Sequence, residues 1–312
     1  MINLIKYKKI PFIISSVLFV VSVIILLTIG LRPGIDFTGG SLLEVSFTET
    51  RPNTQEVRDS LSQIEFDLGD PVIQLSEEKN MLIRTKFVNE DEHQQVLSTL
   101  RESFEVQVDE EAGIVENKVW EERIETIGPA ISAHLKSRAV YAVLAVVIAI
   151  VIYVAYAFRK VSKPVQSWKY GISAVIALIH DVTLTMAIFA LLGKYLNVEI
   201  GIPFVVALLT ILGYSVNDTI VVFDRVRENL IKRTADKFSE MVNLGVNQTF
   251  VRSINTSVTT LVVLFALFLF GGESIKYFAL ALIVGIASGT YSSIFLASPL
   301  LVVWEQLKNK RD

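Results

Sequence analysis

Six stretches of this chain are long enough and apolar enough to cross a lipid bilayer. They span residues 10–31, 139–158, 170–193, 200–223, 253–272 and 277–304. A bilayer core of about 30 Å requires about 20 apolar residues in helical form, and each stretch reaches that length. The hydrophobic share of the chain, 52%, also exceeds that of an ordinary soluble domain. The sequence therefore predicts a polytopic α-helical membrane protein with six transmembrane helices.

Charge predicts how these helices are oriented. Sixteen Lys and Arg residues lie in segments that would share one face of the membrane, namely 6–9, 159–169, 225–252 and 308–311. The short loops on the opposite side contain only Lys194 and Lys276. Because cytoplasmic loops carry an excess of Lys and Arg, we expect both termini to be cytoplasmic. The first stretch follows basic residues as a secretory signal would, but it is too long and lacks a cleavage site, so we expect it to remain as an anchor.

The predicted organisation has four parts. Residues 1–32 form a cytoplasmic N-terminus and the first helix, and residues 33–137 form an extracytoplasmic (periplasmic) domain. Residues 138–304 form helices two to six with a cytoplasmic loop at 224–252, and residues 305–312 form a cytoplasmic tail. The extracytoplasmic domain is acidic, with 22 acidic and 9 basic residues.

The acidic domain alternates between strand-like and helix-like patterns. Strands are expected at 41–47, 72–75, 81–87 and 119–127, and helices at 54–66 and 89–103, with Asn53 and Glu56 spaced for a capping box. The order β-α-β-β-α-β predicts an α+β, ferredoxin-like domain between helices 1 and 2. The run Asp109, Glu110 and Glu111 could bind a cation, although such runs are usually solvated loops. We find no catalytic group, and we predict no metal site, no cofactor and no cysteine chemistry, since the chain has no Cys.

Asp218 interrupts an otherwise uncharged stretch. An acidic residue at membrane depth is costly unless it faces protein or water, so it is a candidate functional site. Tyr214 and Asn217 lie on the same face of that helix, and Arg252, Asn255 and Thr256 form a second polar stripe on the next. We interpret Asp218 as a proton-binding group tuned by Arg252 and the polar side chains around it. The alternative is a static Asp–Arg pair that joins two helices.

His180 and Asp181 lie near the middle of the third apolar stretch. Either could support proton transfer, or each could simply hydrogen-bond a neighbouring helix. Small residues recur every four positions in the last stretch, at Ala281, Gly285, Gly289 and Ser293. That spacing favours close helix packing rather than a pore.

Two runs resemble the signatures of the SecF family of protein-export membrane subunits. The first, 34–41, contains Gly34, Asp36, Gly39 and Gly40, and the second, 213–229, contains Tyr214, Asn217 and Asp218. The runs 252–257 and 180–182 fit the same family. The glycines of the first run could serve as a hinge or as ordinary tight-turn residues.

The resemblance implies membership of the resistance-nodulation-division (RND) superfamily and use of the proton motive force. It implies a bacterial cytoplasmic (inner) membrane protein that works with SecD beside the SecYEG translocon, with YajC- and YidC-like proteins, on a translocating preprotein. It maps the family's intramembrane Asp and Arg onto Asp218 and Arg252. No enzymatic activity and no nucleic-acid partner are expected.

Two other function classes stay open. One is an RND-type proton-coupled exporter of small molecules or lipids, which a single six-helix half with one small domain disfavours. The other is an intramembrane protease that uses Asp181 and Asp218 as a carboxylate pair, because two acids sharing a proton can activate water. The Gly-x-Gly context of that protease class is absent around Asp218.

Overall fold

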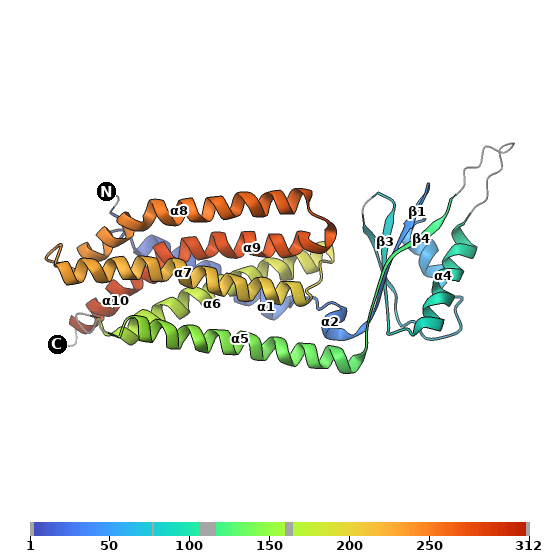
Figure 1. Cartoon of the computed structure of the whole chain (residues 1–312), viewed down its shortest axis with the longest axis horizontal. Coiled ribbons are helices and arrows are strands. Elements are labelled where there is room, and N and C mark those ends of the chain that lie inside the picture. Colours follow the sequence, from blue (N-terminus) through green and yellow to red (C-terminus); the bar gives the residue numbers. More distant parts are fainter. Residues whose placement is uncertain (1–2, 77, 106–116, 160–164, 310–312) are drawn as a thin grey trace. The chain divides into compact units, whose positions relative to one another are not determined.

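The chain folds into two compact units in the computed structural model, which describes residues 3–76, 78–105, 117–159 and 165–309. One unit joins Met1–Arg32 to Ala139–Asp312, and the other is Pro33–Arg138 (Figure 1). The acidic run at 109–111 lies outside the described residues.

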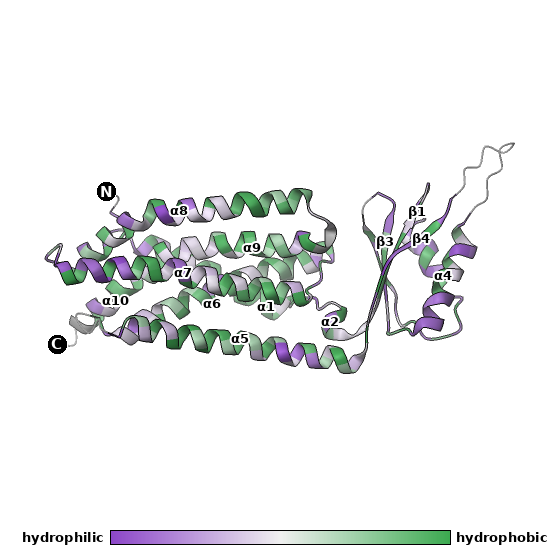
Figure 2. Cartoon of the chain, viewed as in Figure 1, coloured by the Kyte–Doolittle hydropathy of each residue, from purple (hydrophilic) through white to green (hydrophobic). Residues whose placement is uncertain are grey.

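Within the described residues, six helices are long and apolar enough to cross a membrane, which confirms the predicted fold class; apart from residues 129–138 they belong to the first unit. They are α1 (Lys9–Thr28), α5 (Pro129–Ala157), α6 (Ser167–Leu196), α7 (Ile202–Lys232), α8 (Phe238–Phe270) and the run of α9 (Glu273–Ser292), the π-helical turn η1 (Ser293–Ala297) and α10 (Ser298–Asn309). Apolar residues predominate along these helices, with polar positions among them (Figure 2). The interior of this unit is formed mainly by α6, α7 and α9, while α1, α5 and α8 expose most of their apolar side chains.

Helices α7 and α8 extend well past the uncharged stretches toward each other along the chain. Helix α7 continues beyond Phe223 to Lys232, and α8 already begins at Phe238. The segment 224–252, expected as a loop, is therefore helical at both ends, with a short connection between them. Glu228 pairs with Arg225 and Lys232 at helical spacing, and a Cβ on Gly245 would lie 2.8 Å from the Val226 side chain. Charge pairing and close packing thus hold the two extensions as helices.

Small residues allow α9 to lie close against α7. A Cβ added to Gly285 would come within 2.2 Å of Ile211, and one added to Gly289 within 2.9 Å of Ser215. Any larger residue at these positions would push the helices apart. The spacing of small residues in the sixth stretch therefore marks a packing interface between α7 and α9.

Among its described residues, the second unit has a four-stranded antiparallel sheet, two longer helices, and a short helix before the first strand. Its elements are the short helix α2 (Ile35–Thr38), β1 (Gly40–Phe47), α3 (Thr54–Leu61), β2 (Val72–Ser76), β3 (Asn80–Thr85), α4 (Glu90–Phe104) and β4 (Val119–Ile127). The strand order is β2-β3-β1-β4, and every neighbouring pair is antiparallel. This is the ferredoxin-like β-α-β-β-α-β arrangement that the sequence predicted.

The core of this unit is formed by apolar residues that alternate along the strands and recur at helical spacing in the helices. Inward-facing residues of β1, among them Val45 and Phe47, pack with Met81 and Ile83 of β3 and with Leu100 of α4. The expected capping box is present, since Asn53 accepts from the Glu56 amide and Glu56 accepts from the Asn53 amide. Helix α3 ends at Leu61, short of the expected 66, yet Ile64 and Phe66 still pack against the core.

Candidate functional site

Asp218 is held where three elements of the helical unit meet. The residue is 9% exposed, and its carboxylate accepts a hydrogen bond from Ser253 of α8 at 2.5 Å and one from Ser293, the first residue of η1. Helix α7 places the side chain on the face that looks between α8 and the α9–η1 junction. Each carboxylate oxygen therefore has a hydroxyl donor from a different helix.

Arg252 lines the same small cavity as Asp218 but forms no ion pair with it. A cavity of about 50 Å³ is lined by Tyr214, Asn217, Asp218, Val221, Arg252 and Thr256. Such a volume is enough for water, since one water molecule needs a cavity of about 10–15 Å³ when the volume is measured for the centre of a water-sized sphere. Within the described residues, no ion pair joins the Arg252 guanidinium to Asp218 or to any other carboxylate. The static Asp–Arg pair is thus absent from this arrangement, and the serines take the position nearest the carboxylate.

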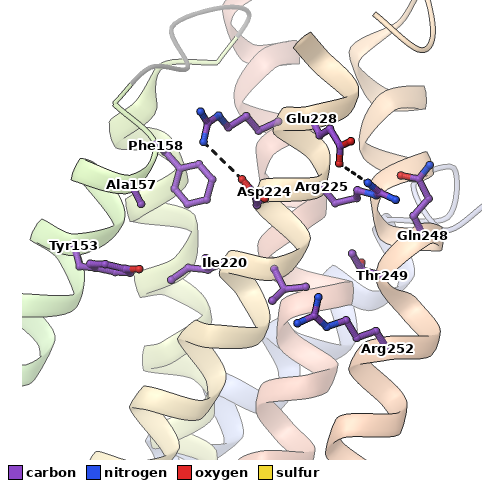
Figure 3. A pocket seen from close by; sticks show the side chains of 12 residues that line it. Tyr153, Ala157, Phe158, Ile220, Asp224, Arg225, Glu228, Gln248, Thr249 and Arg252 are labelled. Carbon is purple, nitrogen blue, oxygen red and sulfur yellow. Dashed lines mark hydrogen bonds and ion pairs between the residues drawn. The ribbon is translucent and has the colours of Figure 1, made fainter. Parts of the chain in front are cut away.

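A wider cavity continues from Arg252 toward the end of α7. It has a volume of about 540 Å³ and is lined from α5, α7 and α8 (Figure 3). Arg227 pairs with Asp224 at 3.6 Å there, and Arg225 pairs with Glu228. Val221 and Arg252 line both cavities. The two cavities therefore adjoin at these two residues.

The expected polar residues around Asp218 face outward from this unit. Asn217, Arg252, Asn255 and Thr256 are exposed, and Tyr214 is half-buried with its hydroxyl 3.5 Å from Thr260. Apolar side chains such as Val258 and Val262 are exposed on the same helix α8. A polar stripe on helices of membrane-spanning length is costly against acyl chains, so it calls for water or protein in front of it.

Asp181 occupies a separate position inside the helical unit. Its side chain is fully buried and accepts from Ser215 of α7 at 2.8 Å and from Ser288 and Ser292 of α9 at 2.7 Å each. The Nδ1 atom of His180 lies 3.1 Å from the same carboxylate, and His180 Nε2 is buried without a hydrogen-bond partner among the described residues. Within the part of the chain described, no hydrogen bond links the two acids, because separate serines hold each carboxylate. The carboxylate pair of an aspartyl protease is therefore not formed.

The glycine run at 34–41 belongs to the other unit and shapes the start of β1. Gly34 precedes α2, Asp36 lies in its first turn, and Gly39 and Gly40 follow with φ of 73° and 128°. A Cβ on Gly40 would lie 2.6 Å from the carbonyl oxygen of Thr85, and one on Gly39 would lie 3.3 Å from that of Ile127. Positive φ and close backbone approach both require glycine here.

Sequence reasoning missed the serines that hold the two acids. No role was predicted for Ser215, Ser253, Ser288 or Ser292. Ser293 was predicted only to allow close helix packing as a small residue. A weak signal was available, since 288–293 contains three serines and a threonine in an otherwise apolar helix. Serine is common at helix contacts in membranes, so the sequence alone gives no reason to assign these hydroxyls to a particular carboxylate.

Comparison with known proteins gives consistent similarities along the whole chain. Residues 107–307 match the family model of protein export membrane protein SecD/SecF, C-terminal, and residues 24–50 match the SecD/SecF GG motif. Protein translocase subunit SecF of Thermobaculum terrenum is 40% identical over 315 residues, covering 98% of this chain and 94% of the relative. The SecF subunit of Haemophilus influenzae is 38% identical, covering 94% of this chain and 82% of the relative.

A solved structure extends this similarity to three dimensions. The crystal structure of SecDF, a translocon-associated membrane protein from Thermus thermophilus, superposes with a TM-score of 0.80 at 32% identity over 98% of this chain. This chain spans only 39% of the length of that SecDF chain. The similarity therefore covers one part of a larger protein.

Proposed function

Because this chain belongs to the SecF family of protein-export membrane proteins, we propose that it is the SecF subunit of a Sec translocase and couples proton movement at Asp218 to preprotein export. The subunit would work with SecD in the bacterial inner membrane, beside the SecYEG translocon and with YajC- and YidC-like proteins. It would promote late steps of export by means of the proton motive force.

One observation carries this proposal. The carboxylate of Asp218 is buried among membrane-spanning helices, is bonded by two serine hydroxyls, and borders a cavity large enough for water. Hydroxyl groups can donate to an ionised carboxylate and accept from a protonated one, so this environment accommodates both states. A fixed Asp–Arg pair, by contrast, would favour the ionised state alone.

The outward-facing polar stripe supports a partner subunit. Asn217, Arg252, Asn255 and Thr256 cannot remain against lipid without cost, and helices of SecD would cover them. The SecDF chain, of which this chain spans 39%, has the additional length that such a partner would supply. Arg252 would then lie between the two subunits, where it could approach Asp218 in another conformation.

Each proton that crosses the membrane would supply energy for one cycle of movement. Moving one charge across the membrane potential provides about 2.3 kcal/mol per 100 mV. A change in protonation can shift a conformational equilibrium only if the two conformations bind the proton with different affinity. Different hydrogen bonds to Asp218 in the two states would provide that difference, and the acidic extracytoplasmic unit would follow the helices.

The test is the substitution Asp218→Asn in a membrane-vesicle export assay, with Asp224→Asn as the matched control. Asp224 lies on the same helix α7 but is exposed and pairs with Arg227. We expect Asp218→Asn to abolish the part of export that depends on the proton gradient, and Asp224→Asn to retain it. Full gradient-dependent export by a correctly inserted Asp218→Asn protein would refute the proposal.

A further inference from the structure

Asp181 has the most complete set of hydrogen-bond donors in the described part of the membrane-spanning helices. Three serine hydroxyls donate to its two oxygens, Ser288 to Oδ1 and Ser215 and Ser292 to Oδ2. His180 Nδ1 is close enough to add a fourth contact. These groups come from α6, α7 and α9, so Asp181 of α6 fixes the other two helices relative to its own.

The contact between Ser292 and Asp181 lies directly beside the Asp218 site. Ser292 donates to Asp181, and the next residue, Ser293, donates to Asp218. Adjacent residues of a helix point in directions about 100° apart, since a turn takes 3.6 residues. Holding Ser292 against Asp181 on one side of α9 therefore directs Ser293 toward Asp218 on another side.

The backbone changes its winding at the same residue. The π-helical turn η1 begins at Ser293, and Ser298 donates its hydroxyl to the Ser293 carbonyl at 2.8 Å. Single π-turns inside α-helices are rare overall, and those that occur are often found at functional sites. Without a fixed point just before it, this turn would leave the direction of Ser293 poorly determined.

Helix α7 is fixed at the same level. Ser215 donates to Asp181 and precedes Asp218 by three residues, about one turn. Gly289 of α9 lies close against Ser215, where an added Cβ would approach to 2.9 Å. Asp181 thus contacts two of the helices that lead to the Asp218 site, through Ser215 on α7 and Ser292 on α9, while the third, α8, supplies Ser253.

We propose that Asp181 is a positioning residue for Asp218, acting through the Ser292–Ser293 pair. This inference rests on the proposed function, in which Asp218 exchanges a proton. The titratable or charged groups facing Asp218 are Tyr214 of α7 and Arg252 of α8, and those near Asp181 are His180 of α6 and, next to that ring, Tyr291 of α9. Among the described residues, the hydroxyl groups that donate hydrogen bonds to the two carboxylates all belong to serines.

The test follows the protonation of Asp218 itself. Full-length protein in proteoliposomes is titrated with pH by infrared spectroscopy, and the Asp218 band is identified as the carboxylic-acid carbonyl stretch that Asp218→Asn removes. We compare Ser292→Ala with Ser288→Ala. Both substitutions remove one serine donor from Asp181 on the same helix, but only Ser292 adjoins Ser293.

We expect Ser292→Ala to move the Asp218 midpoint to higher pH by at least about half a pH unit, because a misdirected Ser293 weakens a hydrogen bond to the ionised form. Ser288→Ala should move it much less. Asp181→Asn should move the midpoint in the same direction as Ser292→Ala. Ser292→Thr keeps the hydroxyl group and should therefore leave the Asp218 midpoint at its original value. A folding defect in Asp181→Asn would leave the serine comparison decisive.

Three outcomes would overturn the positioning role: equal shifts in the two serine variants, no shift in either, or an Asp218 band that does not titrate. The export assay is read separately. If Asp218→Asn exports normally while Ser292→Ala still moves the Asp218 titration, the proposed function is wrong and the positioning role stands. Loss of export in Asp218→Asn with no response to Ser292→Ala gives the reverse conclusion.

Discussion

Replacing Gly40 with alanine tests whether the glycine run acts as a hinge or as a structural requirement of the sheet. Gly40 has a φ of 128°, a conformation that costs a residue with a side chain about 1–3 kcal/mol. The new Cβ would also lie 2.6 Å from the Thr85 carbonyl oxygen, and overpacking of this kind costs about 1–3 kcal/mol more. The Thr85 oxygen belongs to β3, which is paired with β1 from Ser41 onward, so it cannot easily withdraw. We expect the free energy of unfolding of the sheet unit to fall by about 2–6 kcal/mol in total.

Hydrogen exchange of the full-length protein measures this loss locally. If the amides of β1 and β3 exchange by opening of the sheet unit, 2 kcal/mol corresponds to an increase of about 30-fold in their exchange rate. Gly69→Ala is the matched control. Gly69 also has a positive φ, 74°, but its added Cβ would meet only the flexible side chain of Lys86. Unchanged protection of β1 and β3 in Gly40→Ala would refute the steric argument and favour a pure hinge.

Two further predictions concern packing and orientation. Gly285→Ala should lower the free energy of unfolding of the helical unit by about 1–3 kcal/mol, because the added methyl group overpacks against Ile211. In an Ile211→Ala background that effect should largely disappear, and its persistence there would show that another contact is responsible. The chain has no cysteine, so single cysteines report topology directly. Gln63→Cys should react with a membrane-impermeant maleimide in intact cells and Asp236→Cys only after permeabilisation, and the opposite pattern would reverse the orientation that the Lys and Arg distribution predicts.

Most elements of the fold could be predicted from local pattern. Strand β4 was expected at 119–127 and is observed at Val119–Ile127, and the Asn53–Glu56 capping box forms as the spacing indicated. Each of these features depends on residues within a few positions of one another. Helix ends were predicted less well, because α5, α7 and α8 continue into charged sequence that hydropathy alone does not count as membrane-spanning.

The candidate site was predicted in part. Asp218 and Arg252 stood out because a charge within an apolar stretch is rare, and the structure places both on one cavity. The role of Ser293 could not be deduced, since its distance from Asp218 is 75 residues along the chain. Its neighbour Ser292 serves a different acid 111 residues away. A serine in a helix carries no local signal of the carboxylate it will meet.

The amino-acid sequence by itself determined that this chain has six stretches able to span a membrane, carries a ferredoxin-like domain between the first two, and places two acids within those stretches. Those properties follow from hydropathy, period and charge, which act over a single helix or strand. Only the tertiary structure decided that serines rather than Arg252 contact Asp218, that Asp181 is separate from it, and that α9 connects the two. The reason is geometric: a hydrogen bond between helices depends on their spacing and rotation, which the close contacts at Gly285 and Gly289 constrain for α7 and α9.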